Sequence, residues 1–468
     1  MARFERGGEF VEIWVEELPE RIGPDGAVVH QWPELRERSG RIGHEAAAES
    51  VALERRFQWS ARRDYARAQS QRLRDGWRRV EDPAHEHVLA DEPRDPALEA
   101  ALAADPGDVE AALVYADWLQ HREHWRGDLI AVQAARLARP DDPKLEDAER
   151  RLFADHLPDV FGPLWSHVEH DNAGFQLAWE LGFIKTARLV GKQHDGESED
   201  LLWELLRHPS ARFLRELAIG CHHSGDQDNE LICDVLMHAG PSPPLRKLQI
   251  ADFDESKIDN IDISRAPIGD LTGLGTKFPA LDDVVLKGTG DVVLGELSLP
   301  KAKRFALRTS SLTRATLTSI VRAPWPELRD LELWFGDPDR GYGAECELDD
   351  ALAIFRCELP QLRTLRIMNA MFSDEIIPAL LAWPGAAQLE AVEFSLGTLS
   401  DAGADALIAG RERLPNLARL GVFECALSTA GLERLATAGL HPDPSPISPA
   451  HTWREPVQKP SRYVSVSE

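Results

Sequence analysis

The chain has 468 residues, with 53 Lys and Arg against 79 Asp and Glu, and its formal net charge is −26. This length excludes one ordinary globular core, so we expect two or three structural units. The strong negative charge opposes nonspecific binding to nucleic acid or to an anionic membrane.

The charge is distributed unevenly along the chain. Residues 1–80 hold 15 basic and 14 acidic side chains (net +1), residues 81–180 hold 8 and 23 (net −15), and residues 181–468 hold 30 and 42 (net −12). Such different balances predict separately built modules. The five cysteines are an odd number without a disulfide framework, and no signal-peptide core or 18-residue apolar run occurs. We therefore expect a cytoplasmic protein without a membrane span.

Residues 1–80 are predicted to form a small α+β module. Residues 10–15 alternate like a strand, Val28 and Val29 suggest another, and a basic helix is predicted through residues 65–73. The string Arg38-Ser-Gly-Arg-Ile-Gly43, with Leu73-Arg-Asp-Gly-Trp-Arg-Arg-Val80 downstream, resembles the WGR domain. Ser39 stands where that family has its naming tryptophan. Some members of the family bind nucleic acid, which the resemblance implies as a function to consider here.

Two interpretations of this basic module remain open. Residues 36–80 contain 12 Arg against 6 acidic residues, so arginines could contact phosphates. The candidates for such contacts are Arg41, Arg55, Arg56, Arg62 and Arg63. The alternative is that the basic helix docks on the acidic middle module, which the total charge and the missing tryptophan favour.

Residues 94–180 are predicted to form a small helical domain, in which residues 98–133 form two or three short amphipathic helices with a break at Asp105-Pro106. The string Tyr115-Ala-Asp-Trp-Leu119, followed by Arg126-Gly127 and Leu129-Ile-Ala-Val-Gln133, resembles the bacterial repeat-companion domain. That family is named for its place beside repeats, and its own function is obscure. Asp117 and Arg126 are expected to form an ion pair or helix cap rather than an acid–base pair, with Tyr115 and Trp118 in the core.

Residues 181–440 contain a repeated hexapeptide of the form Leu-x-x-Leu-x-Leu. Its copies begin at Leu214, Leu245, Leu281, Leu328, Leu362, Leu389 and Leu417, with a weaker copy at Ala302. Each copy predicts a short strand, and helical patterns follow at residues 312–321, 374–381, 400–408 and 428–435. Ser373, Ser400 and Ser428 are predicted as N-caps. Successive copies lie 31, 36, 21, 26, 34, 27 and 28 residues apart, and the spacing of 21 predicts a repeat that lacks its helix.

A strand-plus-helix unit of 26 to 28 residues resembles the ribonuclease-inhibitor type of leucine-rich repeat. The resemblance implies an α/β solenoid in which parallel strands line a curved face and helices lie outside. Residues between and after the buried leucines would then line the concave face. The predicted partner-binding residues there are Arg304, Arg308, Glu332, Trp334, Arg366, Met368 and Phe423.

An exposed row of aromatic and charged side chains on that face favours binding of a protein partner. The alternative is that opposite charges pair across neighbouring strands and the aromatic residues cover loop edges, with Trp334 under the loop of residues 336–343.

The sequence as a whole predicts a non-enzymatic scaffold that binds a protein through the concave face and its flanking loops. A nucleic-acid-associated factor using the N-terminal arginines is the alternative function.

No motif predicts a catalytic, cofactor or metal site. Cys221-His222-His223, with Cys233 and His238, has the only metal-type ligands in a cluster, and their spacing matches no zinc pattern. The sequence contains no nucleophile elbow, zinc-protease motif or P-loop. Residues 441–468 are rich in proline and predict an extended or disordered tail, or a loose cap on the last repeat.

Overall fold

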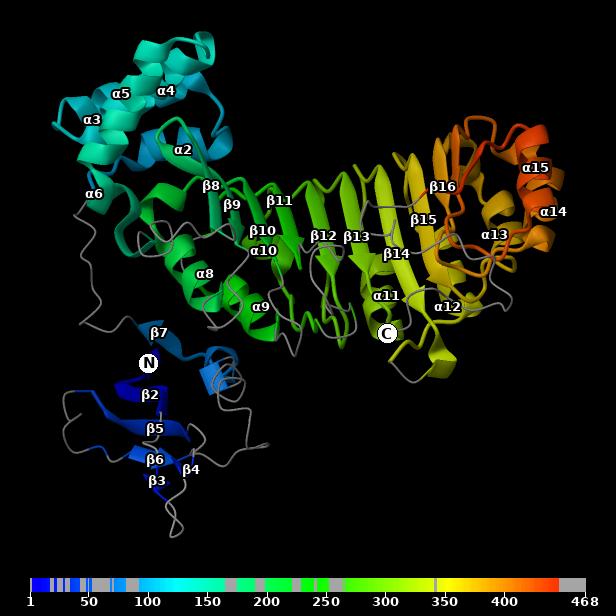
Figure 1. Cartoon of the computed structure of the whole chain (residues 1–468), viewed down its shortest axis with the longest axis horizontal. Helices are drawn as coiled ribbons and strands as arrows, with labels where there is room; N and C mark the ends of the chain where they lie inside the picture. Colours follow the sequence, from blue (N-terminus) through cyan, green and yellow to red (C-terminus); the bar gives the residue numbers. More distant parts are fainter. Residues whose placement is uncertain are drawn as a thin grey trace.

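The computed structural model describes residues 2–16, 21–22, 28–29, 34–42, 48, 50–52, 68–69, 71–80, 92–164, 175–189, 198–220, 229–239, 242–251, 263, 266–340 and 343–445. These residues form an α/β protein with one large, mostly parallel sheet, a small antiparallel sheet and a group of helices (Figure 1). Within these ranges no helix is long and apolar enough to cross a bilayer.

The large sheet has eleven strands that follow one another in chain order (Figure 1). They are β8 (Phe175–Glu180), β9 (Phe183–Leu189), β10 (Glu216–Ile219), β11 (Lys247–Ile250), β12 (Asp283–Lys287), β13 (Arg304–Arg308), β14 (Asp330–Gly336), β15 (Thr364–Ala370), β16 (Ala391–Glu393), β17 (Arg419–Gly421) and β18 (Pro442–Asp443). Only β8 runs antiparallel to its neighbour. Every copy of the hexapeptide contributes one strand, as predicted.

The fourth position of each hexapeptide holds the sheet in register. In-register pairing puts these residues into one row: Leu217, Leu248, Val284, Phe305, Leu331, Leu365, Val392 and Leu420. All of them are buried in the main core. Burial of such a side chain contributes about 1.5–3 kcal/mol before the loss of conformational entropy. The repeats therefore stabilise one another through a continuous core.

Helices of varied length follow most strands. They are α8 (Ser198–Arg207), α9 (Asn229–His238), α10 (Leu274–Lys277), α11 (Arg314–Arg322), α12 (Leu348–Ala351), α13 (Ile377–Ala382), α14 (Asp401–Ala409) and α15 (Thr429–Thr437), with 3-10 turns at η3 (Pro209–Ala211), η5 (Pro338–Arg340), η6 (Leu352–Arg356), η7 (Pro384–Gln388) and η8 (Arg411–Arg413). Residues 288–303, between β12 and β13, contain no helix, which confirms the prediction from the short spacing. Pro378 delays α13, which begins at Ile377 rather than near residue 374.

Serine caps link the last repeats to one another. Ser400 and Ser428 cap α14 and α15, as predicted. Each also binds an aspartate of the preceding repeat through its backbone N–H and its hydroxyl. The N–H and hydroxyl of Ser428 donate to the two oxygens of Asp401 at 2.9 and 2.6 Å. Ser373 caps no helix; its hydroxyl donates to the Ala370 carbonyl at 2.9 Å, which corrects the prediction for that residue.

The helical domain lies at the β8 end of the large sheet (Figure 1). Its described residues form α2 (Pro96–Ala104), α3 (Val109–Gln120), α4 (Trp125–Ala138), α5 (Pro143–Asp155) and α6 (Leu157–Phe161), followed by η2 (Gly162–Leu164). The first three correspond to the helices predicted for residues 98–133. Tyr115 and Trp118 stack with ring centroids 5.7 Å apart, and the Tyr115 ring is buried. Asp117 is exposed and is not the partner of Arg126, which contradicts the predicted pair.

Arg126 instead joins the helical domain to the large sheet. Its guanidinium is fully buried and forms an ion pair with Glu92. It also donates to the Gly182 carbonyl in the β8–β9 turn and to the Ser210 hydroxyl, the latter at 3.0 Å. The neighbouring Gly127 lies where α3 and α4 cross, since an added Cβ would stand 2.7 Å from the Ala116 carbonyl oxygen. The Arg-Gly pair therefore fixes the contact between these elements.

The N-terminal module contains a five-stranded antiparallel sheet in the order β6-β5-β2-β1-β7. Its strands are β1 (Ala2–Arg6), β2 (Glu9–Glu16), β5 (Glu34–Arg41), β6 (Ser50–Ala52) and β7 (Arg78–Val80), and β3 (Arg21–Ile22) pairs separately with β4 (Val28–Val29). Residues 68–69 and 71–74 are helical. Arg74 pairs with Asp234 of α9 at 3.5 Å, and Arg79 stacks on Trp203 of α8. Within the described residues, these contacts dock the module on the first helices of the repeat region.

Candidate binding surface

The large sheet has a second face, away from the main core, which we call the charged face. Successive residues of a strand point to opposite sides, so Leu331 and Leu333 enter the core while Glu332 points to the other side. Register pairing then places equivalent residues of neighbouring strands side by side. The charged face of β12–β16 carries Asp283, Lys287, Arg304, Arg308, Asp330, Glu332, Trp334, Arg366, Met368 and Glu393.

Glu332 occupies the centre of the charged face and is 1% exposed. Arg308 donates to its two oxygens from Nε at 2.7 Å and Nη2 at 3.2 Å. Trp334 Nε1 donates to the same carboxylate at 2.9 Å. Burial alone would raise the pKa of Glu332, but the arginines and the Trp334 hydrogen bond outweigh it and lower the pKa. Glu332 is therefore an ionised anchor for arginines from the neighbouring strands.

Arg366 extends the same network across three strands. Its guanidinium pairs with Asp330 on β14 and, at 3.1 Å, with Glu393 on β16. Its Nη1 also lies 3.9 Å from a Glu332 oxygen. Three arginines (304, 308 and 366) thus face four carboxylates (283, 330, 332 and 393), a local charge of −1. Opposite charges pair across neighbouring strands here, as the second interpretation of the sequence predicts.

Arg304 and Asp283 keep hydrogen-bonding capacity that this network does not use. Their closest atoms, Nη1 and Oδ1, are 3.9 Å apart, which is too far for a hydrogen bond. Among the described residues, neither Arg304 Nε nor Asp283 Oδ1 has a hydrogen-bond partner. Burial raises the pKa of Asp283, although the charges of Arg304 and Lys247 act against it. About a third of each side chain is exposed, although Arg304 Nε and Asp283 Oδ1 themselves are buried.

The predicted aromatic row is buried rather than exposed, which corrects that expectation. Trp334, Met368 and Phe423 are at most 4% exposed and pack together with Ile263 and Leu396 in a separate apolar cluster. Strand alternation places these side chains on the face away from the main core, as expected. Strand alternation alone does not indicate whether other parts of the chain cover that face.

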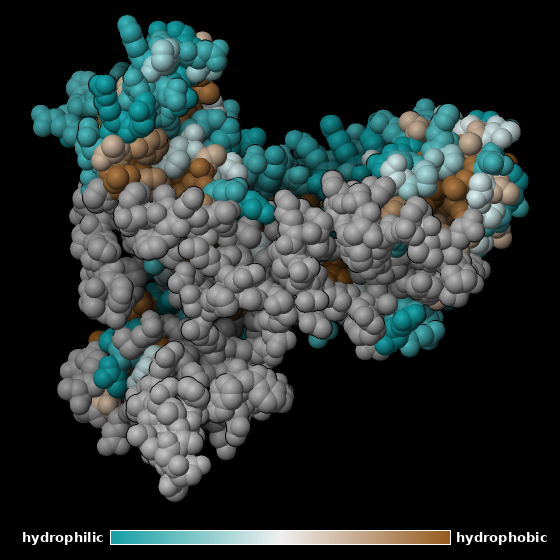
Figure 2. Space-filling view, in the orientation of Figure 1, coloured by the Kyte–Doolittle hydropathy of each residue, from teal (hydrophilic) through white to brown (hydrophobic). Residues whose placement is uncertain are grey.

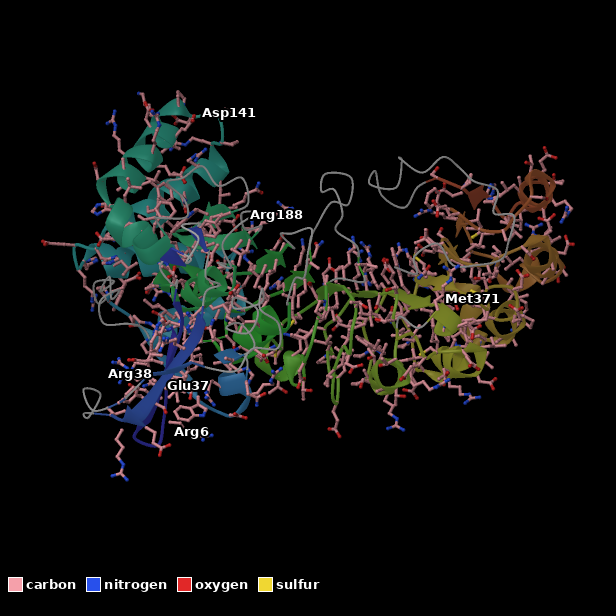
Figure 3. The ribbon with its side chains drawn as sticks, turned by 60° about the horizontal axis from the view of Figure 1, so that its bottom comes forward. Arg6, Glu37, Arg38, Asp141, Arg188 and Met371 are labelled. Atoms are coloured by element: carbon pink, nitrogen blue, oxygen red, sulfur yellow. The ribbon has the colours of Figure 1, made fainter. Side chains whose placement is uncertain are left out.

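The N-terminal arginines are only partly within the described residues. Arg41 is exposed at the end of β5, while Arg55, Arg56, Arg62 and Arg63 lie outside the described residues. Arg38 pairs with Glu12, and Arg72 pairs with Glu37 at 2.6 Å. Figure 3 shows Glu37 and Arg38 on this small sheet, away from the large one. The described contacts of this module are therefore mostly internal ion pairs.

Sequence reasoning named Glu332 and the three arginines of the charged face as partner-binding residues, but not the other carboxylates of that network. Asp283, Asp330 and Glu393 occupy the same repeat positions one or two copies away, so comparing equivalent positions between copies could have found them. Cys221, His222 and His223 lie outside the described residues. Within the described part, no group of three or more His, Cys, Asp or Glu is arranged to hold a metal ion.

Comparison with protein-family models finds no match to this chain, and comparison with curated proteins finds none either. Among solved structures, a structural genomics target from Bacteroides fragilis aligns over 95% of this chain and 96% of its own length. The sequence identity is 16% and the TM-score is 0.47. Similarity at this level assigns no function to the chain.

Proposed function

We propose that this chain is a non-enzymatic scaffold that binds a protein partner through the charged face of a leucine-rich-repeat solenoid. In this proposal the repeat-companion-like helical domain closes one end of the array and the WGR-like module packs beside it. The observation that carries the proposal is the Arg304–Asp283 pair, whose side chains are about a third exposed and lie next to the ionic network of Glu332. A partner that supplies a carboxylate and a hydrogen-bond donor there would pair with the exposed parts of these two side chains.

The network beneath this pair favours recognition because it fixes the arginines before a partner arrives. Arg304 Nη2 lies 3.8 Å from the buried Glu332 carboxylate, which in turn holds Arg308 and Arg366. Side chains held in this way lose less rotamer entropy on binding than free ones. The buried apolar cluster does not contribute a surface, so the charged residues carry the proposed contact.

The proposal is tested with the full-length chain as bait, in three forms: wild type, the double variant Asp283→Ser with Arg304→Ser, and the control Arg322→Ala. Arg322 is exposed on α11, on the helical side of the repeat region. Proteins captured by wild type and control are identified by mass spectrometry, and their affinities are measured with purified components. We expect at least one partner to lose about tenfold or more in affinity for the double variant, which corresponds to about 1.4 kcal/mol. If every partner binds the three forms equally, the charged face is not the binding surface.

A further inference from the structure

The residue just before each strand forms a row along the edge where the strands of the large sheet begin. The row consists of Arg215, Arg246, Asp282, Lys303, Arg329, Arg363, Glu390 and Ala418. Backbone hydrogen bonds fix its geometry: the Lys303 carbonyl accepts from the amides of Arg329 and Asp330 at 2.8 and 3.0 Å, and the pattern repeats along the row. Neighbouring strands lie about 4.8 Å apart, so the row presents side chains at that interval.

Three basic side chains at this edge lack the partners that the arginines of the charged face have. Arg246, Arg329 and the adjacent Lys301 are exposed. Among the described residues, none of these three side chains has a hydrogen-bond or ion-pair partner. Lys303 pairs with Asp282 at 3.4 Å, and Arg363 pairs with Glu390 at 3.7 Å and donates to the Gln388 carbonyl at 3.3 Å; both side chains are about half exposed. Three unpaired cations close together, Arg246, Lys301 and Arg329, are unexpected in a chain whose net charge is −26.

Part of this row forms the floor of a groove. The groove has a volume of about 280 Å³, and its other wall is the end of α2 at Ala103 and Ala104. Its charged lining consists of Arg246, Asp282, Lys301, Lys303 and Glu327. Figure 2 shows hydrophilic residues along this upper edge, between the helical domain and the last repeats. The volume lies at the lower end of the range for small-ligand sites, which suits a short extended segment.

We propose that this edge is a second binding site, distinct from the charged face, that takes an extended acidic peptide segment of a partner protein. Carboxylates of the segment pair with Arg246, Lys301 and Arg329, and the small side chains of Ala103 and Ala104 let its backbone approach the wall. Asp282 and Glu327 accept hydrogen bonds from the peptide backbone N–H groups. A peptide fits better than a nucleic acid, because a phosphate at every nucleotide would face these two carboxylates, whereas a peptide can place uncharged residues there.

The site is tested with a fluorescein-labelled peptide of ten alternating Glu and Gly residues, added to the full-length chain at 50 mM salt and followed by fluorescence anisotropy. The peptide with Gln in place of Glu and a ten-residue oligo(dT) are measured in parallel. The protein variants are the triple change Arg246→Ala, Lys301→Ala and Arg329→Ala, and the control Arg322→Ala. Thermal unfolding of each variant checks that it is folded.

We expect the Glu peptide to bind wild type and the control equally and more tightly than the Gln peptide. An exposed charge pair changes affinity by a factor of about 1.4 to 5, so the triple variant should bind about tenfold more weakly. Raising the salt should weaken binding to wild type but hardly change binding to the triple variant. Equal binding to the triple variant and wild type, or no binding to wild type, would overturn the proposal. Tighter binding of oligo(dT) than of the Glu peptide would assign the edge to nucleic acid instead.

Discussion

Replacing Glu332 by Gln should destabilise the repeat region, because three arginines converge on this buried carboxylate. At about 4 Å and an effective dielectric constant of about 20, each arginine contributes about 4 kcal/mol of attraction. Desolvation of the buried charges offsets several kcal/mol of that sum. Gln keeps an acceptor for Trp334 Nε1, which lies 2.9 Å away. Breaking a buried pair costs about 3–5 kcal/mol, so we expect a loss of about 2–4 kcal/mol.

Urea unfolding of the full-length chain, followed by tryptophan fluorescence, measures this loss. The expected decrease in midpoint is on the order of 1 M urea. The matched control is Glu390→Gln, since Glu390 is 64% exposed and its pair with Arg363 is 3.7 Å long. That variant should stay within about 0.5 kcal/mol of wild type. Equal midpoints for the two variants would refute the view that the charged face is a coupled network.

The pH dependence gives a second check on Glu332. Its folded-state pKa is lowered, so its contribution is present above the unfolded pKa of about 4.3 and is lost as the pH falls through the folded pKa. The difference between wild type and Glu332→Gln should therefore be full at pH 7 and shrink below about pH 4. A difference that stays constant from pH 7 to pH 3 would mean that the charge of Glu332 contributes nothing.

Three further changes test other parts of the fold. Gly431→Ala places a Cβ against Asp401 Oδ1, closer than real Cβ atoms approach. The hydrogen bonds between Ser428 and Asp401 should therefore break, and the free energy of unfolding, measured by thermal unfolding, should fall by about 1–3 kcal/mol. An unchanged melting curve would refute this. Burial and the charge of Arg126 lower the pKa of His208 to about 3. Below about pH 6.5 the unfolded state therefore binds a proton that the folded state does not, and stability falls by about 1.4 kcal/mol per pH unit. His208→Asn should flatten that slope between pH 6.5 and pH 4 in urea titrations, and an identical slope would contradict the assignment. Arg126→Met leaves buried partners unpaired, so we expect the free energy of unfolding to fall by about 3–5 kcal/mol, as measured by thermal unfolding. A loss below 1 kcal/mol would show that Arg126 does not hold the helical domain on the large sheet.

The hexapeptide by itself determined the strands, their order and the buried row from Leu217 to Leu420. It could do so because strand alternation and hydrophobic spacing are local properties that any one copy displays. The short spacing after Leu281 likewise determined that one repeat lacks a helix, and Ser400 and Ser428 marked helix starts. Local chemistry was sufficient for each of these features.

Tertiary structure alone decided which of the residues on the second face are exposed and with what they pair. Trp334 is buried because it meets Ile263, Leu396 and Phe423, which are up to 89 residues away in the chain. Arg126 pairs with Glu92 rather than Asp117 because the fold brings that carboxylate, the Gly182 carbonyl and Ser210 around one guanidinium. Periodicity fixes the side of a strand to which a residue points. The segments that cover that side depend on contacts between distant residues, and one sequence does not display them.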